Sequence, residues 1–106
     1  MITEIENMEA FNEAISKPTC SVVDFYVNWC SLCKTLHPKY ENFSKIYTNV
    51  SFYQVDVNEV SDVVYMAGFI NIPSFKFYKN NKLIGEFQGD DPEELEKIIK
   101  ENNKIN

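Results

Sequence analysis

Two cysteines separated by two residues are the part of this sequence best suited to chemistry. Cys30 and Cys33 stand in the segment Trp29-Cys30-Ser31-Leu32-Cys33. Thiols at this spacing can close to a disulfide and reopen, or they can supply two of the ligands of a metal site. The chain holds 3 cysteines, an odd count that suits a disulfide-stapled secreted scaffold poorly. The pair is therefore expected to be catalytic or metal-binding.

A metal site would need ligands beyond these two thiols. His37, the only histidine, follows Cys33 by one helical turn, and Cys20 is the only spare thiol. A structural zinc site usually needs four well-placed ligands, and nothing in the sequence brings Cys20 to the others. We expect no metal, a solvated His37 and a small, buried Cys20.

An acid interrupts the apolar run that precedes the cysteines. The residues from Val22 to Val27 are β-branched or aromatic except for Asp24, a pattern that predicts a central strand buried on both faces. Because this strand feeds the cysteine loop, a buried Asp24 carboxyl could lie beneath Cys33, and burial would raise its pKa. The alternative is a structural carboxylate satisfied by backbone donors at a strand end.

The cysteines should lie on the first turn of a helix. Apolar positions recur every three to four residues after Cys30, and Pro38 inside this pattern predicts a kink; these positions are Leu32, Leu36, Tyr40, Phe43 and Tyr47. A thiol at a helix N-terminus is close to unpaired backbone N–H groups and to the positive end of the helix dipole, which stabilise a thiolate. Cys30 occupies that place, whereas Cys33 should be more buried and less ionised.

The remaining patterns complete an α/β fold. A helix is expected over 7–16, a strand over 52–57, and a helix from an Asn58 cap to Gly68. A hairpin with its turn at Asn80-Asn81 joins strands within 74–87, and Asp91-Pro92 begins a final helix. The alternation of strand and helix predicts parallel βαβ pairing in one domain over residues 1–106.

Composition excludes several classes of function. At 106 residues and 44% hydrophobic content, the chain can bury a core, and its net charge of -6 opposes binding to nucleic acid. No apolar run approaches the roughly 20 residues that span a bilayer, and the first residues lack the pattern of a signal peptide. We therefore expect a soluble, cytoplasmic protein.

A series of motifs runs in order along most of the chain, from about Val22 to Ile99: Val-Val-Asp-Phe, Trp-Cys-x-x-Cys-Lys, Pro38, Val55-Asp56-Val57-Asn58, Ile72-Pro73-Ser74-Phe75 and Gly89. In these motifs the sequence resembles the thioredoxin family. Together they are far more specific than an isolated C-x-x-C. Two positions depart from the family: Ser31-Leu32 replaces Gly-Pro between the cysteines, and Gln54 stands where a lysine is often found near the buried acid.

The resemblance implies a three-layer α/β/α fold with a central mixed sheet, and it implies roles for the site residues. Cys30 would attack a substrate disulfide, Cys33 would resolve the mixed disulfide, and Asp24 would accept the proton of Cys33. A cis Pro73 would leave the backbone of Ile72 free to pair with an extended substrate. The groove around Cys30 would be framed by Trp29, Ile72, Pro73 and Gly89, and Ser31 and Leu32 would tune the redox potential.

The expected activity is the reduction of protein disulfides without a bound cofactor. By resemblance, a thioredoxin-reductase-like flavoenzyme would recycle the dithiol, and the protein would be a monomer. Two alternatives remain at this point. One is a more oxidising oxidase or isomerase of the same fold, which Ser31-Leu32 would allow. The other is a non-catalytic binding module, against which the retained Cys30, Cys33 and Asp24 argue.

Overall fold

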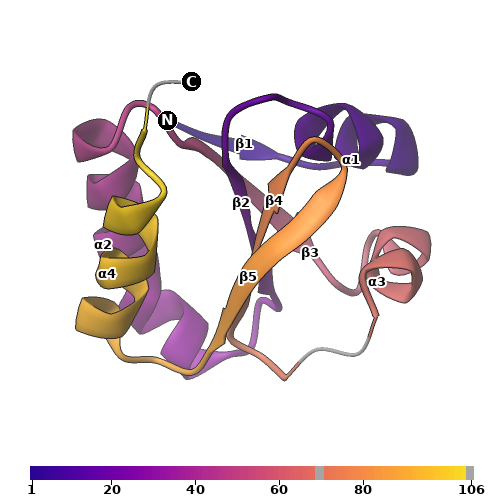
Figure 1. Ribbon diagram of the computed structural model, residues 1–106. Helices are drawn as coiled ribbons and strands as arrows, with labels where there is room; N and C mark the ends of the chain where they lie inside the picture. Colours follow the sequence, from indigo (N-terminus) through magenta and orange to yellow (C-terminus); the bar gives the residue numbers. More distant parts are fainter. Residues whose placement is uncertain (69–70, 105–106) are drawn as a thin grey trace.

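The computed structural model describes residues 1–68 and 71–104 as one mixed sheet covered by helices on both faces (Figure 1). The five strands lie in the order β1-β3-β2-β4-β5. Helices α2 and α4 cover one face, and α1 and α3 cover the other. The expected three-layer α/β/α architecture is thus confirmed. The elements are β1 (Ile2–Glu4), α1 (Met8–Ile15), β2 (Ser21–Tyr26), α2 (Ser31–Ile46), β3 (Ser51–Asp56), α3 (Ser61–Ala67), β4 (Ser74–Lys79), β5 (Lys82–Gln88) and α4 (Pro92–Glu101).

The register of the strands places three loops at the same end of the sheet. Strands β1, β3 and β2 are mutually parallel, whereas β4 is antiparallel to both β2 and β5. Phe25 near the end of β2 is paired with Ser74 at the start of β4, and Ser74 is paired with Gln88 at the end of β5. Three segments therefore meet at this end of the sheet: the cysteine loop after β2, the segment before β4 and the segment after β5.

Strand β2 is buried on both faces, as its apolar run predicts. Val22 packs in the cluster beneath α2 and α4, and Val23 packs in the cluster beneath α1 and α3. Because side chains alternate along a strand, Asp24 lies on the same face as Val22, toward α2. The apolar core thus fixes which helix the single acid of this strand meets.

Local signals set most element ends. The Asn7 side chain caps α1, and Asp91 caps α4 ahead of Pro92. Asn80 and Asn81 adopt positive φ angles of 52° and 67° in the β4–β5 turn, which asparagine tolerates better than most residues. Gly68, with φ of 90°, ends α3 as expected. The predicted hairpin is confirmed.

Two features differ from the sequence-based expectations. The short strand β1 was not predicted, because three residues carry no period and become a strand only by pairing with Phe52–Gln54. Asn58 does not cap α3: its N–H donates to the Asp56 side chain at 2.9 Å, and the helix begins after Val60 without a side-chain cap.

Among the described residues, no helix has both the length and the apolar character needed to cross a membrane.

Candidate active site

The cysteine pair lies where β2 leads into α2. Cys30 is the N-cap residue of α2, and Cys33 lies in its first turn, with the two Cα atoms 5.2 Å apart and the sulfurs joined in a disulfide. The backbone N–H of Cys33 donates to Cys30 Sγ at 3.0 Å. Cys30 is half-buried, whereas Cys33 is only 9% exposed. The N-terminus of the helix therefore directs a backbone donor at the more accessible sulfur.

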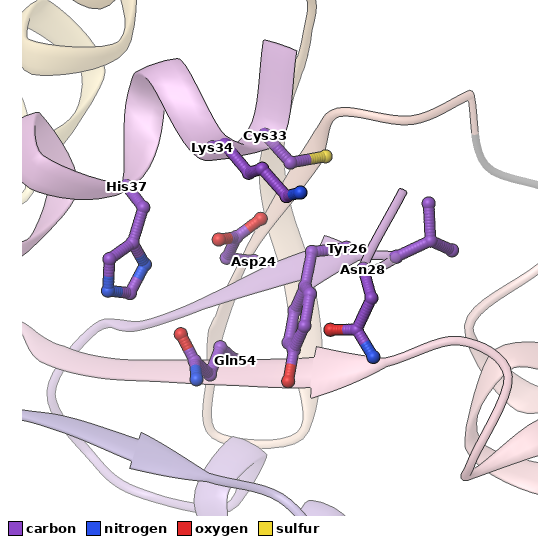
Figure 2. A pocket seen from close by; sticks show the side chains of 8 residues that line it. Asp24, Tyr26, Asn28, Cys33, Lys34, His37 and Gln54 are labelled. Atoms are coloured by element: carbon purple, nitrogen blue, oxygen red, sulfur yellow. The ribbon is translucent and has the colours of Figure 1, made fainter. Parts of the chain in front are cut away.

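Asp24 faces the same helix from below. A cavity of about 160 Å³ extends from its carboxyl to Cys33 (Figure 2). Asp24 is 6% exposed, and its Oδ1 has no hydrogen-bond partner among the described residues. Burial, aided by the Glu4 carboxylate, raises the pKa of Asp24 to about 8. The structure thus brings Asp24 and Cys33 to one cavity, and the alternative of a carboxylate satisfied by backbone donors lacks support for Oδ1.

Other polar residues line this cavity, and of these the sequence motifs had pointed only to Gln54 as a neighbour of the buried acid. They are Tyr26, Asn28, Lys34, His37 and Gln54. Lys34 and His37 are one helical turn apart on α2, and both are exposed, as expected for His37. Their spacing from Cys30 and Cys33 along one helix face is the signal that could have placed them here. Gln54 reaches the cavity from β3, where it is paired with Asp24.

The residues expected to frame a substrate groove occupy the adjoining loops. Trp29 is 75% exposed, and the neighbouring Leu32 is 44% exposed. The Ile72–Pro73 peptide bond is cis, and the Gly89 N–H donates to the Pro73 carbonyl at 3.1 Å. Pro73 itself is buried, while Ile72 and Gly89 are half-buried. The structure thus leaves the Trp29 and Leu32 side chains exposed next to the cysteines, whereas the Pro73 side chain is buried.

Cys20 takes no part in this site. Cys20 is buried and free, and burial raises the pKa of its thiol to about 11, so it holds its proton at neutral pH. Over residues 1–68 and 71–104, no three His, Cys, Asp or Glu side chains converge in a way that could hold a metal ion.

Comparison with known proteins gives the site its family. The family model named Thioredoxin matches residues 2–101. The chain belongs to the thioredoxin family. It is 37% identical to thioredoxin-1 of Schizosaccharomyces pombe over 102 residues, which cover 96% of this chain and 99% of that protein. It is 38% identical to human thioredoxin over 103 residues, covering 95% and 98% of the two chains.

The solved structures agree with this assignment. The thioredoxin of Malassezia sympodialis superposes with a TM-score of 0.94 at 30% identity, covering 98% of this chain and 92% of that one. With its disulfide-capable Cys30–Cys33 pair, this thioredoxin-family chain is a thiol–disulfide oxidoreductase with protein disulfide reductase activity.

Proposed function

We propose that Cys30 attacks the substrate disulfide and that Cys33 releases the product. The observation that carries this assignment is the placement of Cys30 at the N-cap of α2, where its sulfur accepts the N–H of Cys33 at 3.0 Å. A donor and the positive end of the helix dipole stabilise a thiolate at Cys30. Cys33, which is buried one turn further on, does not meet the substrate first.

The exchange then proceeds in two balanced steps. The Cys30 thiolate attacks one sulfur of a substrate disulfide, forms a mixed disulfide and expels the other substrate sulfur as a thiolate, which takes a proton from solvent. Cys33 loses its proton and attacks Cys30 Sγ, so that the Cys30–Cys33 disulfide forms and the second substrate thiolate leaves. The substrate gains two electrons, and the protein loses two.

Asp24 is proposed to accept the proton of Cys33 in the second step. The carboxyl and the thiol line one cavity, which supplies a route for the proton. A pKa of about 8 leaves roughly a tenth of the carboxyl ionised at pH 7, and it matches the acceptor to a thiol whose usual pKa is about 8.5. A carboxylate of ordinary pKa would be a far weaker base toward this thiol.

We further propose that substrates are extended, disulfide-bonded protein segments bound beside Trp29. The exposed Trp29 and Leu32 side chains offer apolar contact. The Ile72–Pro73 segment and Gly89 lie at the same end of the sheet as the cysteine loop. Backbone groups of the Ile72–Pro73 segment can pair with an extended chain in the manner of an added strand. Ser31 and Leu32 between the cysteines are proposed to tune the potential.

Turnover requires a source of two electrons to reopen the Cys30–Cys33 disulfide. By family resemblance we propose a thioredoxin-reductase-like flavoenzyme as that source, and a monomeric protein working in the cytoplasm. The net negative charge of -6 supports proteins rather than polyanions as partners.

Trapping the mixed disulfide tests the assignment of the two cysteines. A Cys33→Ser chain should accumulate a covalent adduct with a disulfide-bonded substrate through Cys30, because the second step is lost. A Cys30→Ser chain should accumulate little, since Cys33 is buried. The adducts are counted by non-reducing electrophoresis and mass spectrometry, with Cys20→Ser as the control that should still reduce insulin. Equal trapping by the two active-site variants would contradict the assignment.

A further inference from the structure

Three polar side chains lie in a row across three neighbouring strands. Glu4 on β1 is paired with Gln54 on β3, and Gln54 is paired with Asp24 on β2. Residues paired across adjacent strands point to the same face of the sheet. This face is the one beneath α2, because Asp24, Gln54 and Cys33 line the same cavity. The row thus joins the edge strand of the sheet to the floor of the active site.

The orientation of the Gln54 amide is fixed by a hydrogen bond to Glu4 on the edge strand β1. Gln54 Nε2 donates to Glu4 Oε1 at 2.7 Å, and the Tyr26 hydroxyl donates to the two Glu4 carboxylate oxygens at 3.1 Å each. A carboxylate only accepts hydrogen bonds, so the amide nitrogen must face Glu4 and the amide oxygen must turn the other way. Figure 2 shows this arrangement, with the Gln54 oxygen on the side of Asp24 and the nitrogen on the opposite side.

An amide oxygen turned toward Asp24 would favour one protonation state of that carboxyl. The oxygen can accept a hydrogen bond from a protonated carboxyl, but it offers no donor to an ionised one. Oδ1 of Asp24 also lacks a donor among the described residues, and the negative Glu4 lies beyond Gln54. A lysine in place of Gln54 would have the opposite effect, because its positive charge would favour the ionised form.

The other groups around Asp24 do not fill this role. Phe75, its partner on β4, is apolar, and Lys76 lies on the opposite face, where it donates to the Ala67 carbonyl at 2.8 Å. The titratable groups that approach Asp24 from α2 and from its own strand are Cys33, Lys34, His37, Tyr40 and Tyr26. Lys34 and His37 are exposed and therefore solvent-screened, whereas the Glu4–Gln54 contact is partly buried.

We propose that Glu4 and Gln54 are positioning residues for thiol–disulfide exchange, with Glu4 holding the Gln54 amide so that its oxygen faces Asp24 and favours the protonated carboxyl. This inference rests on the proposed role of Asp24 as proton acceptor. A protonated Asp24 must first release its proton toward solvent before it can take that of Cys33. The pair therefore sets the pH at which product release becomes fast.

The test is the titration of the Asp24 carboxyl carbon, followed by NMR in the oxidised protein, where no exchange takes place. Glu4→Gln should lower the titration midpoint by about one pH unit, because the distant negative charge is removed. Gln54→Lys should lower it further, since a cation then replaces the amide oxygen. Glu6→Gln is the matched control: it removes the same charge from an exposed residue two positions along the chain, and it should leave the midpoint in place.

An Asp24 midpoint in Glu4→Gln and in Gln54→Lys equal to that in Glu6→Gln would overturn the inference. A second readout separates it from the proposed role of Asp24. The pH midpoint of product release, measured in single turnovers of the reduced variants, should move in the same direction as the NMR midpoint. If the titration moves and the release profile does not, the pair controls the Asp24 proton as inferred, and the role of Asp24 in release is what fails.

Discussion

Asp24 and Cys33 face one cavity of about 160 Å³, the carboxyl from strand β2 and the sulfur from the first turn of helix α2. The acid is fixed by strand pairing on both sides, with Gln54 on β3 and Phe75 on β4. The helix is fixed by an apolar contact surface on the same face of the sheet. The separation of the carboxyl and the thiol is therefore set by the core rather than by a loop.

The first prediction concerns the pH dependence of product release. In the reduced protein, release should accelerate as pH rises toward about 8, where the Asp24 carboxyl becomes ionised. Asp24→Asn should slow release about 100-fold at pH 7 and abolish that inflection, because a general base is removed. Single-turnover reduction of a fluorescent peptide disulfide measures this rate. Asp56→Asn, an equally conservative change at an acid outside the cavity, is the control. A release profile in Asp24→Asn equal to the parent's would rule out the proton-transfer role.

The second prediction concerns stability in the oxidised protein. The pKa of Asp24 is about 8 in the folded chain and about 3.9 when unfolded. Between these values the folded chain keeps a proton that the unfolded chain has lost, so the free energy of unfolding falls as pH rises from about 4 to about 8. Because of Asp24, the free energy of unfolding should thus fall by on the order of 3 kcal/mol between pH 5 and pH 8. Below pH 4 both states are protonated, and this contribution vanishes.

Urea denaturation at several pH values checks that expectation. Asp24→Asn should unfold with a nearly constant free energy over pH 5 to 8, and it should be more stable than the parent at pH 8, because the buried charge is gone. A parent protein whose stability rose over this interval, with the Asn variant following it, would show that the pKa of Asp24 is not raised.

The third prediction concerns the residue that replaces the proline of the family. The backbone donor that the structure places at Cys30 Sγ is the N–H of Cys33, and Leu32 adds a further N–H to the same helical turn that a proline would lack. Leu32→Pro keeps the Cys33 donor and removes one N–H from the first turn of α2. We expect the reduction potential to fall by about 30 mV or less and the pKa of Cys30 to rise, since the thiolate loses part of its stabilisation.

Equilibration with glutathione or with a reference thioredoxin measures that potential. Ser31→Gly is a useful companion, because it alters the other substituted position and leaves every backbone donor in place. A potential that rises in Leu32→Pro, or one that stays fixed together with the Cys30 pKa, would refute the account based on helix donors.

The fourth prediction concerns a buried hydroxyl beneath the active-site helix. Tyr40 is fully buried, and its hydroxyl lies 2.7 Å from the Tyr53 carbonyl and 3.2 Å from the Val22 carbonyl. Tyr40→Phe should lower the free energy of unfolding by about 1 to 2 kcal/mol, because a buried hydrogen bond is lost. Tyr47→Phe is the matched control: its hydroxyl donates to Glu96 at 2.6 Å at a partly exposed position, and its loss should cost less. Equal losses in chemical denaturation would contradict this ranking.

Local sequence patterns predicted most of the fold but only part of the candidate site. The C-x-x-C spacing, the acid in an apolar strand and the Asn80-Asn81 turn each have short-range causes, and the structure has all three features. Strand β1 has no such signal, because it exists through pairing with residues fifty positions later. The Asn58 cap was wrong because the helix begins only at Ser61, with Val60 as its N-cap residue, so Asn58 lies in the preceding turn.

The cavity around Asp24 could not be predicted from local patterns, because it depends on residues that are far apart in the sequence. Its lining comes from β2, β3 and α2, and the Glu4 contact adds β1. No spacing along the chain joins Glu4 to Gln54, and only the register of the parallel strands does so. The departure at Gln54 was visible in the sequence, but the direction of its amide depends on a partner from another strand.

The same row of side chains makes folding a proton-consuming event. At pH 6 the unfolded chain carries Asp24 as a carboxylate, whereas the completed sheet carries it protonated, so each molecule that folds should bind about one proton from the medium. Glu4 and Gln54 meet only when β1 joins β3. In weak buffer with an indicator dye, refolding would turn the medium slightly alkaline, and the time course of that change would follow the closing of the sheet around its acid.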